Sequence, residues 1–148
     1  MYLNLAPIQH YCAYQERCHS EVKQKLYELG FRGNEVEEAL AELISENFLN
    51  EERYARAYVR GKFNNNHWGR NKILQALKQK QVSAYCIKKG MQEIDEEAYL
   101  ETIAKLAEKK FYELRGERLA YIRKQKVQRY LVQKGFEYDI IADVLKEK

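Results

Sequence analysis

Residues that favour turns and strands are scarce in this chain of 148 residues, which has one proline, seven glycines and a single threonine. Collagen-like repeats and proline-rich linkers are excluded, and so are most β-sandwiches and barrels, because those folds need many turn residues and β-branched side chains. Good helix formers dominate what remains. The composition therefore predicts an all-α fold, and an apolar fraction of 45% is enough to build a buried core.

Long hydrophobic runs and targeting segments are also missing. No stretch approaches 18 apolar residues without a charge, and the N-terminal stretch lacks the basic and apolar regions of a signal peptide. The three cysteines are an odd number without the spacing of a disulfide framework, which fits free thiols in a reducing compartment. We therefore expect a cytoplasmic protein with no membrane segment.

Motifs of the common enzyme classes are absent from the sequence. It contains no glycine-rich phosphate loop, no His-Glu-x-x-His zinc motif and no nucleophile elbow. The best metal-binding candidate is the group His10, Cys12, Cys18 and His19, but its spacing matches no ordinary zinc pattern and Cys18 lies on an apolar helical stripe. We expect no catalytic activity, no cofactor and no metal.

Charge is unevenly distributed along the chain, although the net charge is only +4. Residues 1–52 carry a net charge of −6, residues 53–90 carry ten Lys or Arg and no acidic residue, and residues 91–148 sum to zero. A block of one sign attracts polyanions or acidic protein surfaces. Within it, Phe63 and Trp68 flank an Asn-rich loop, where they either contact a partner or pin the junction between two repeats. The candidate binding residues of this block are Arg53, Arg56, Arg60, Lys62, Trp68, Arg70, Lys72, Lys78 and Lys80.

Three segments of the sequence repeat one helical pattern. They are residues 22–31, 73–82 and 127–136, which lie 51 and 54 residues apart, and their apolar positions stay in register beyond the aligned segments. Each unit of such a repeat holds two or three helices and buries its apolar stripe against its neighbours. The expected architecture is therefore an elongated array of tandem three-helix repeats.

Helical periodicity and capping residues place eight helices in this array. The first repeat has helices that begin near residues 18, 34 and 50, the second has helices at 69–81, 83–91 and 95–113, and the third has helices at 117–134 and 137–147. The expected N-caps are Asn34, Asn50, Ser83 and Asp95. The expected division is a lead-in over residues 1–9, repeat 1 over 10–64, the basic repeat 2 over 65–114 and repeat 3 over 115–148. The third repeat therefore lacks one helix of the pattern.

The run from Phe48 to Val59, FLNEERYARAYV, and the basic segment from Lys72 to Lys80, KILQALKQK, resemble the signature of the RecX regulatory family. The threefold helical repeat is similar as well, and the resemblance covers residues 10–148. It implies a protein that binds RecA recombinase filaments on DNA and modulates them, usually by inhibition, in DNA recombination, repair and the SOS response. Charge alone leaves two alternatives open: a helical protein that binds single- or double-stranded nucleic acid without a recombinase, and a scaffold for an unrelated partner.

Two positions depart from the pattern of that family. The family prefers Asp where this chain has Glu51, and Gly where it has Gln81. A glutamine in a left-handed helix cap costs about 1 kcal/mol relative to glycine. We therefore expect the helix before Gln81 to end with a different turn.

Overall fold

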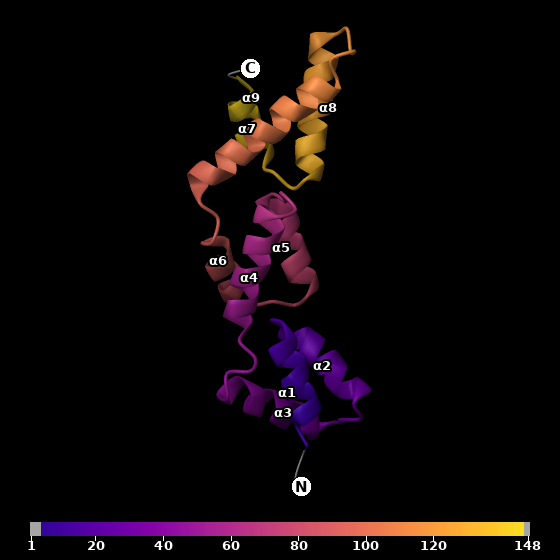
Figure 1. The fold of residues 1–148 in the computed structure, drawn as a ribbon, viewed down its shortest axis with the longest axis vertical. Coiled ribbons are helices and arrows are strands. Elements are labelled where there is room, and N and C mark those ends of the chain that lie inside the picture. The colour runs from indigo at the N-terminus through magenta and orange to yellow at the C-terminus, as the bar shows by residue number, and fades with distance from the viewer. Residues whose placement is uncertain (1–3, 147–148) are drawn as a thin grey trace. The chain divides into compact units, whose positions relative to one another are not determined.

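The computed structural model describes residues 4–146, and within this range the chain forms nine helices and no strand. The helices are α1 (Ala6–Tyr14), α2 (His19–Glu28), α3 (Asn34–Ser45), α4 (Glu51–Asn64), α5 (Arg70–Gln79), α6 (Ala84–Met91), α7 (Glu96–Glu113), α8 (Ala120–Gln133) and α9 (Tyr138–Lys146) (Figure 1). The all-α class is confirmed, and α2 to α9 lie where the periodicity placed them. None of the helices within residues 4–146 is long and apolar enough to cross a membrane.

The described residues separate into two compact units. Unit 1 comprises residues 4–58 and 77–90, and unit 2 comprises residues 59–76 and 91–146. All three boundaries fall inside helices: α4 and α5 are divided between the two units, and Met91, the last residue of α6, belongs to unit 2.

Helix α1 was not predicted from the sequence, which we interpreted as a lead-in up to residue 9. Pro7 lies in its first turn, where the missing amide hydrogen costs nothing, and the Asn4 side chain accepts a hydrogen bond from the Ala6 amide at 3.1 Å. Only Ile8 and Cys12 of this helix are buried. Two apolar positions are too few to establish a helical period, so the pattern of the sequence could not reveal the helix.

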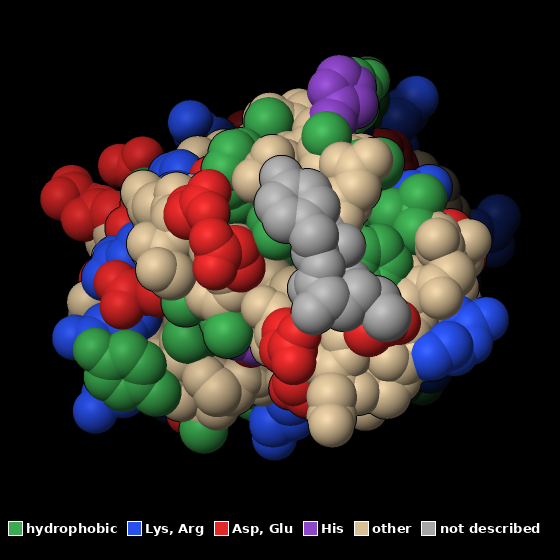
Figure 2. Space-filling view, turned by 90° about the horizontal axis from the view of Figure 1, so that it is seen from below, with side chains coloured by type: hydrophobic (Ala, Val, Ile, Leu, Met, Phe, Trp, Pro, Cys, Tyr) green, Lys and Arg blue, Asp and Glu red, His purple; other side chains and the backbone are tan. Residues whose placement is uncertain are grey.

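The core of unit 1 is formed where α1, α2 and α3 pack together (Figure 1). Its buried side chains are spaced three or four residues apart on each helix, as an amphipathic stripe requires. They are Ile8, Cys12, Val22, Leu26, Val36, Ala39, Leu40, Leu43 and Leu49. Figure 2 looks onto this end of the chain and shows that acidic side chains lie over it, in keeping with the net charge of −6 in residues 1–52.

The core of unit 2 lies largely among α7, α8 and α9. The fully buried side chains that these helices and the turn before α9 contribute are Tyr99, Ile103, Ala107, Val127, Leu131, Phe136, Ile141 and Leu145, and Val59 of α4 and Ile73 of α5 are fully buried as well. Each large aliphatic side chain removed from water contributes roughly 1.5–3 kcal/mol. These three helices therefore form a bundle with its own apolar interior (Figure 1).

The internal repeat is visible in the backbone as three identical helix endings. Gly30, Gln81 and Gly135 all have positive φ, at 98°, 63° and 101°. In each case the next amide bonds to the carbonyl five residues earlier, which is the hydrogen bond of a Schellman turn: Phe31 to Leu26 (3.0 Å), Val82 to Leu77 (3.1 Å) and Phe136 to Leu131 (3.1 Å). The expectation that the helix before Gln81 ends with another turn is therefore wrong, because the hydrogen bonds of the turn outweigh the strain of a non-glycine residue there.

Three of the four N-caps expected from the sequence, Asn50, Ser83 and Asp95, are confirmed. Each cap side chain accepts a hydrogen bond from the amide three residues later, which satisfies one of the unpaired donors at a helix start. The bonds run from Arg53 to Asn50 (2.9 Å), from Cys86 to Ser83 (3.2 Å) and from Ala98 to Asp95 (2.9 Å). The fourth expected N-cap is wrong: Asn34 is the first residue of α3, and the N-cap is Gly33, which has no side chain to accept a hydrogen bond.

Within unit 2, the start of α5 is joined to the end of α8 by main-chain atoms. The Gly69 amide donates to the Lys134 carbonyl at 2.8 Å, and the Asn71 amide donates to the Gly135 carbonyl at 2.9 Å. The positive end of one helix dipole thus meets the negative end of another. A Cβ atom on Gly69 would lie 2.3 Å from the carbonyl carbon of Gly135, so the contact requires glycine.

Candidate functional site

The nine candidate residues are divided between the two units. Arg53, Arg56, Lys78 and Lys80 belong to unit 1, and Arg60, Lys62, Trp68, Arg70 and Lys72 belong to unit 2. Neither unit therefore contains the whole basic block. The clearest grouping of these residues lies in unit 2, around the tryptophan.

Trp68 lies between two lysines at the loop that joins α4 to α5. The Lys62 ammonium is 4.7 Å and the Lys72 ammonium 4.5 Å from the centroid of its ring. The Trp68 amide also donates to the Lys62 carbonyl at 3.0 Å, which fixes the loop at this point. Each cation over an aromatic ring contributes about 0.5–1 kcal/mol when exposed. The structure thus brings together three of the predicted residues.

Lys134 joins this group, although it was not among the candidate residues. Its ammonium donates to the Asn66 carbonyl at 2.9 Å, and burial together with the nearby positive charge of Lys72 lowers the pKa of Lys134. It was missed because it lies 66 residues beyond Trp68 in sequence. The repeat offered a signal, since Lys134 corresponds to Lys80 at the offset of 54. We call Lys62, Trp68, Lys72 and Lys134 the Trp68 cluster.

Two cations of the Trp68 cluster, Lys72 and Lys134, hold positive charge without a paired carboxylate in the described part of the chain. Among the residues that the structure describes, neither Lys72 nor Lys134 has a carboxylate within ion-pair distance. Like charges that converge destabilise each other, and an anion between them removes that repulsion. An aromatic ring flanked by ammonium groups suits a phosphate backbone or an acidic protein surface.

Arg70 instead has a structural role in unit 2. Its guanidinium pairs with Glu96 and, at 3.1 Å, with Glu137, and it lies 4.0 Å from the ring centroid of Tyr99. The Tyr99 hydroxyl donates to Glu137 and accepts the Arg70 amide at 2.9 Å. Burial, followed by the bond to Glu137, raises the pKa of Tyr99. Only 25% of the Arg70 side chain is exposed, so this cation is not available to a partner.

The other arginines among the candidates are also paired with carboxylates. Arg53 additionally donates to the carbonyls of Asn47 and Phe48 at the end of α3, which explains its position better than a binding role does. The pairs are Arg53 with Glu16 (2.6 Å), Arg56 with Glu52 (3.1 Å) and Arg60 with Glu93 (2.7 Å).

The two lysine candidates of unit 1 lie near the end of α5. Lys78 is exposed, whereas Lys80 is half-buried and its carbonyl accepts the Ser20 hydroxyl at 2.7 Å. Nearby, the Glu51 carboxylate receives the Ser83 amide at 3.1 Å and faces His19 Nδ1 at 3.1 Å. Glu51, which departs from the family pattern, thus links the starts of α2, α4 and α6.

The cysteines at the possible metal site are packing residues in this structure. Cys12 and Cys18 are both buried, and burial raises the pKa of each thiol. Within residues 4–146, no three His, Cys, Asp or Glu side chains come together as metal ligands.

Three models of the RecX family match successive parts of the chain. They describe the first three-helix domain of RecX at residues 9–43, the second at 50–91 and the third at 96–145. A crystal structure of the regulatory protein RecX superposes with a TM-score of 0.83 at 31% identity, covering 93% of this chain and 69% of the other. The chain belongs to the RecX family. A RecX crystal structure from Lactobacillus salivarius superposes with a TM-score of 0.88 at 27% identity, covering 95% of this chain and 91% of the other.

Curated RecX relatives show the same kinship in sequence. The regulatory protein RecX of Clostridium perfringens strain 13 is 36% identical over 127 residues, or 85% of this chain. RecX of Clostridium botulinum strain Eklund 17B is 38% identical over 128 residues, or 86% of this chain. This chain spans 59% of the length of each of these two relatives.

The family models divide the repeat at different points from our sequence analysis. In them, α1, α4 and α7 each begin a domain, whereas the sequence division ended its first two repeats with α4 and α7. A tandem array has no intrinsic starting point, so its pattern alone cannot fix the phase. With the domain boundaries of the RecX family models, each of the three domains has three helices, including the last.

Proposed function

We propose that this protein regulates a RecA-type recombinase by binding its filaments on DNA, and that binding lowers the activity of the recombinase. Membership of the RecX family supports this, together with the resemblance of residues 48–59 and 72–80 to the family signature. No part of the proposal requires catalysis by the protein itself.

The observation that carries the proposal is the Trp68 cluster. A filament on DNA presents both phosphates and protein surface. Lys72 and Lys134 offer charge that no described carboxylate neutralises, and the half-buried Trp68 ring offers apolar area. Aromatic rings beside cations are the usual anchors of protein interfaces, and they retain affinity in salt because apolar contact is not screened.

Cosedimentation with recombinase filaments tests the proposal. At about 0.15 M salt, where exposed charges are largely screened, we expect the protein to pellet with filaments assembled on single-stranded DNA and to leave the same DNA unbound when the recombinase is omitted. Equal recovery with bare DNA would favour the alternative function, a nucleic-acid-binding protein without a recombinase partner.

Two double variants with the same change in net charge test whether the Trp68 cluster contacts the filament. We expect Lys62→Glu with Lys72→Glu to abolish cosedimentation and the inhibition of recombinase ATPase, because the cluster then repels phosphate and acidic surface alike. The control is Lys88→Glu with Lys89→Glu on α6, which changes the net charge equally. If both double variants inhibit as the wild type does, the Trp68 cluster is not the contact. Far-UV circular dichroism checks the helical fold of each variant. If a Glu variant does not fold, the variant with Gln at the same positions is used in its place.

A further inference from the structure

The zero net charge of residues 91–148 conceals a second basic region. Residues 105–129 contain nine Lys or Arg and three Glu, a net charge of +6, whereas residues 91–104 contain five acidic residues and no Lys or Arg. The basic part comprises the end of α7, the connection over residues 114–119 and the start of α8. We call residues 105–129 the hairpin tip.

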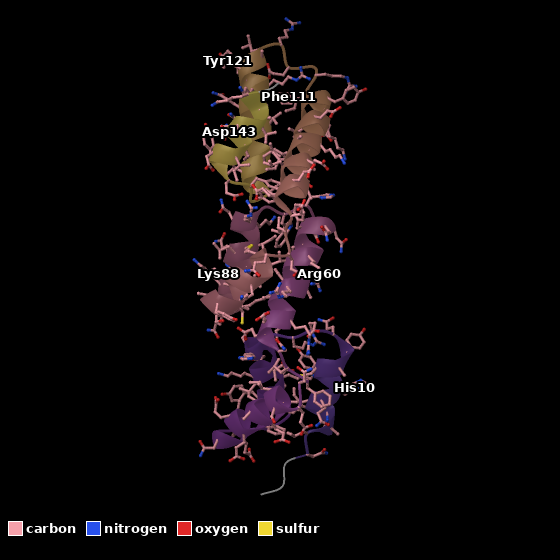
Figure 3. All side chains as sticks on the ribbon, turned by 90° about the vertical axis from the view of Figure 1, so that its left-hand side faces the viewer. His10, Arg60, Lys88, Phe111, Tyr121 and Asp143 are labelled. Atoms are coloured by element: carbon pink, nitrogen blue, oxygen red, sulfur yellow. The ribbon has the colours of Figure 1, made fainter. Side chains whose placement is uncertain are left out.

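Large side chains are exposed at the hairpin tip. Tyr112 and Tyr121 are each 65% exposed and Leu119 is 49% exposed. The Arg115 guanidinium lies 4.2 Å from the centroid of the Tyr112 ring. Figure 3 shows Phe111 on α7 and Tyr121 on α8 at the same end of this helical hairpin. Exposed aromatic rings interleaved with cations are typical of surfaces on which nucleobases stack.

A hollow of about 500 Å³ lies at the hairpin tip, and it is lined by residues of α7, of α8 and of the end of α9. Its apolar lining comes from Phe111, Ala120 and Leu145, and its cationic lining includes Arg118 and Lys124. The volume is within the range of roughly 300–1,000 Å³ of pockets that hold small organic molecules. An apolar surface with cations at its edge matches a nucleotide, which has a flat base and a charged phosphate.

The cations around the hollow differ in their availability. The Arg123 guanidinium donates to the Phe111 carbonyl, and Lys126 pairs with Glu117 at 3.1 Å, so both are engaged in the fold. Arg118 and Lys124 are exposed, and neither has an ion-pair partner among residues 4–146. These two cations are therefore the ones that can meet a phosphate.

The acidic residues at the hollow determine how a bound nucleotide would be oriented. Hydrogen bonding to Lys126 lowers the pKa of Glu117, so this carboxylate is charged and already paired. Glu108 lines the hollow from α7, whereas Lys124 lines it from α8. Repulsion by Glu108 keeps the phosphate at Arg118 and Lys124, and leaves the apolar lining and the exposed Tyr121 ring, which follows the lining residue Ala120, to the bases.

We propose that the hairpin tip binds single-stranded nucleic acid, with a backbone phosphate at Arg118 and Lys124 and with bases against Tyr121 and the apolar lining of the hollow. Single strands fit better than a duplex because only unpaired bases expose the faces that stack on aromatic rings. This binding is separate from the regulation of a recombinase and needs no recombinase.

Fluorescence anisotropy with a labelled 15-residue single-stranded DNA of mixed sequence tests the proposal in the absence of any recombinase. We expect Arg118→Glu with Lys124→Glu to weaken binding by about tenfold or more at low salt, relative to the Lys88→Glu, Lys89→Glu control. The slope of log affinity against log salt should fall by about 0.7, since the two cations hold one phosphate and each phosphate contact on a single strand contributes about 0.7. Tyr121→Ala should weaken binding about fivefold or more and leave the slope unchanged, because stacking involves no counterions.

Three results would overturn the proposal. One is a wild-type protein that does not bind the oligonucleotide at low salt. Another is a tip variant, in Glu or in Gln form and folded by circular dichroism, whose affinity and salt slope match those of the control. The third is Tyr121→Ala with wild-type affinity, or a loss of affinity in the tip variants that is equally large for a duplex of the same sequence. Either outcome would show that the hairpin tip binds through charge alone, without stacking of bases. None of these results depends on filament binding, so a failure here is distinct from a failure of the proposed function.

Discussion

Replacing Gly30 and Gly135 by alanine separates backbone strain from close packing, because the two glycines occupy the same turn in different repeats. Their φ values are 98° and 101°, so each alanine suffers a left-handed penalty of about 1–2 kcal/mol, partly offset by about 0.4–1 kcal/mol of lost freedom in the unfolded chain. A Cβ atom on Gly30 meets nothing within 4 Å, whereas one on Gly135 lies 2.4 Å from the Lys72 Cβ and 2.7 Å from its amide nitrogen. Overpacking against such atoms adds about 1–3 kcal/mol. We expect losses of about 1 kcal/mol for Gly30→Ala and about 2–4 kcal/mol for Gly135→Ala.

Urea unfolding with two probes measures these losses. The chain has a single tryptophan, Trp68, whose fluorescence reports on unit 2, while far-UV circular dichroism reports on all helices. Both probes are needed because repeat arrays do not always unfold in one step. Gly61→Ala is the control: Gly61 lies inside α4 with open space around it, so alanine should stabilise by about 0.5–1 kcal/mol. If Gly135→Ala costs no more than Gly30→Ala, the contact between α5 and α8 is not rigid and our reasoning about it fails.

Three further predictions concern stability and one concerns the shape of the protein in solution. Gln81→Gly should stabilise the protein by about 0.5–1 kcal/mol in thermal unfolding, because glycine removes left-handed strain; a loss of stability would show that the Gln81 side chain makes a contact that outweighs the strain. Arg70→Glu should cost about 2–4 kcal/mol, since it places a third carboxylate beside two others, whereas Lys78→Glu on the exposed surface should change stability by less than about 0.5 kcal/mol; equal urea midpoints would contradict this. Burial raises the pKa of the Cys12 and Cys18 thiols, so their contribution to stability is present below the unfolded thiol pKa of about 8.5 and is lost as the pH rises above it. The urea midpoint should therefore be lower at pH 10 than at pH 7, and this difference should be smaller in a double variant with Cys12→Ala and Cys18→Ala. The elongated array stays a prediction from the sequence, and small-angle scattering should give a radius of gyration above the roughly 15 Å of a compact chain of this length.

The sequence revealed those features that are local and repeated. The alignment of the repeats puts Gly30 and Gly135 at equivalent helix ends, where both form Schellman turns, whereas the same turn at Gln81 was not expected. The caps Asn50 and Asp95 follow from their places before amphipathic stripes. Each depends on atoms within five residues along the chain, which a pattern in one sequence can capture.

The sequence could not reveal pairings over long separations. Arg70 counted as a candidate binding residue because its partners Glu96 and Glu137 lie 26 and 67 residues away. Lys134 was overlooked for the same reason, and the hairpin tip was overlooked because acidic residues elsewhere in the last third of the chain cancel its charge. A charge total over a long segment discards the information about where each charge lies, which only the fold restores.

The bond between α5 and α8 is made by the amides of Gly69 and Asn71 and the carbonyls of Lys134 and Gly135, so no side-chain functional group takes part. Such a main-chain contact requires glycine at two positions and few other particular residues, so neighbouring residues can be substituted during evolution without weakening it. The Lactobacillus salivarius RecX structure shares only 27% of its residues with this chain, yet superposes with a TM-score of 0.88. A main-chain joint of this kind leaves evolution free to rework the outer side chains of the helices to suit different partners while the scaffold persists.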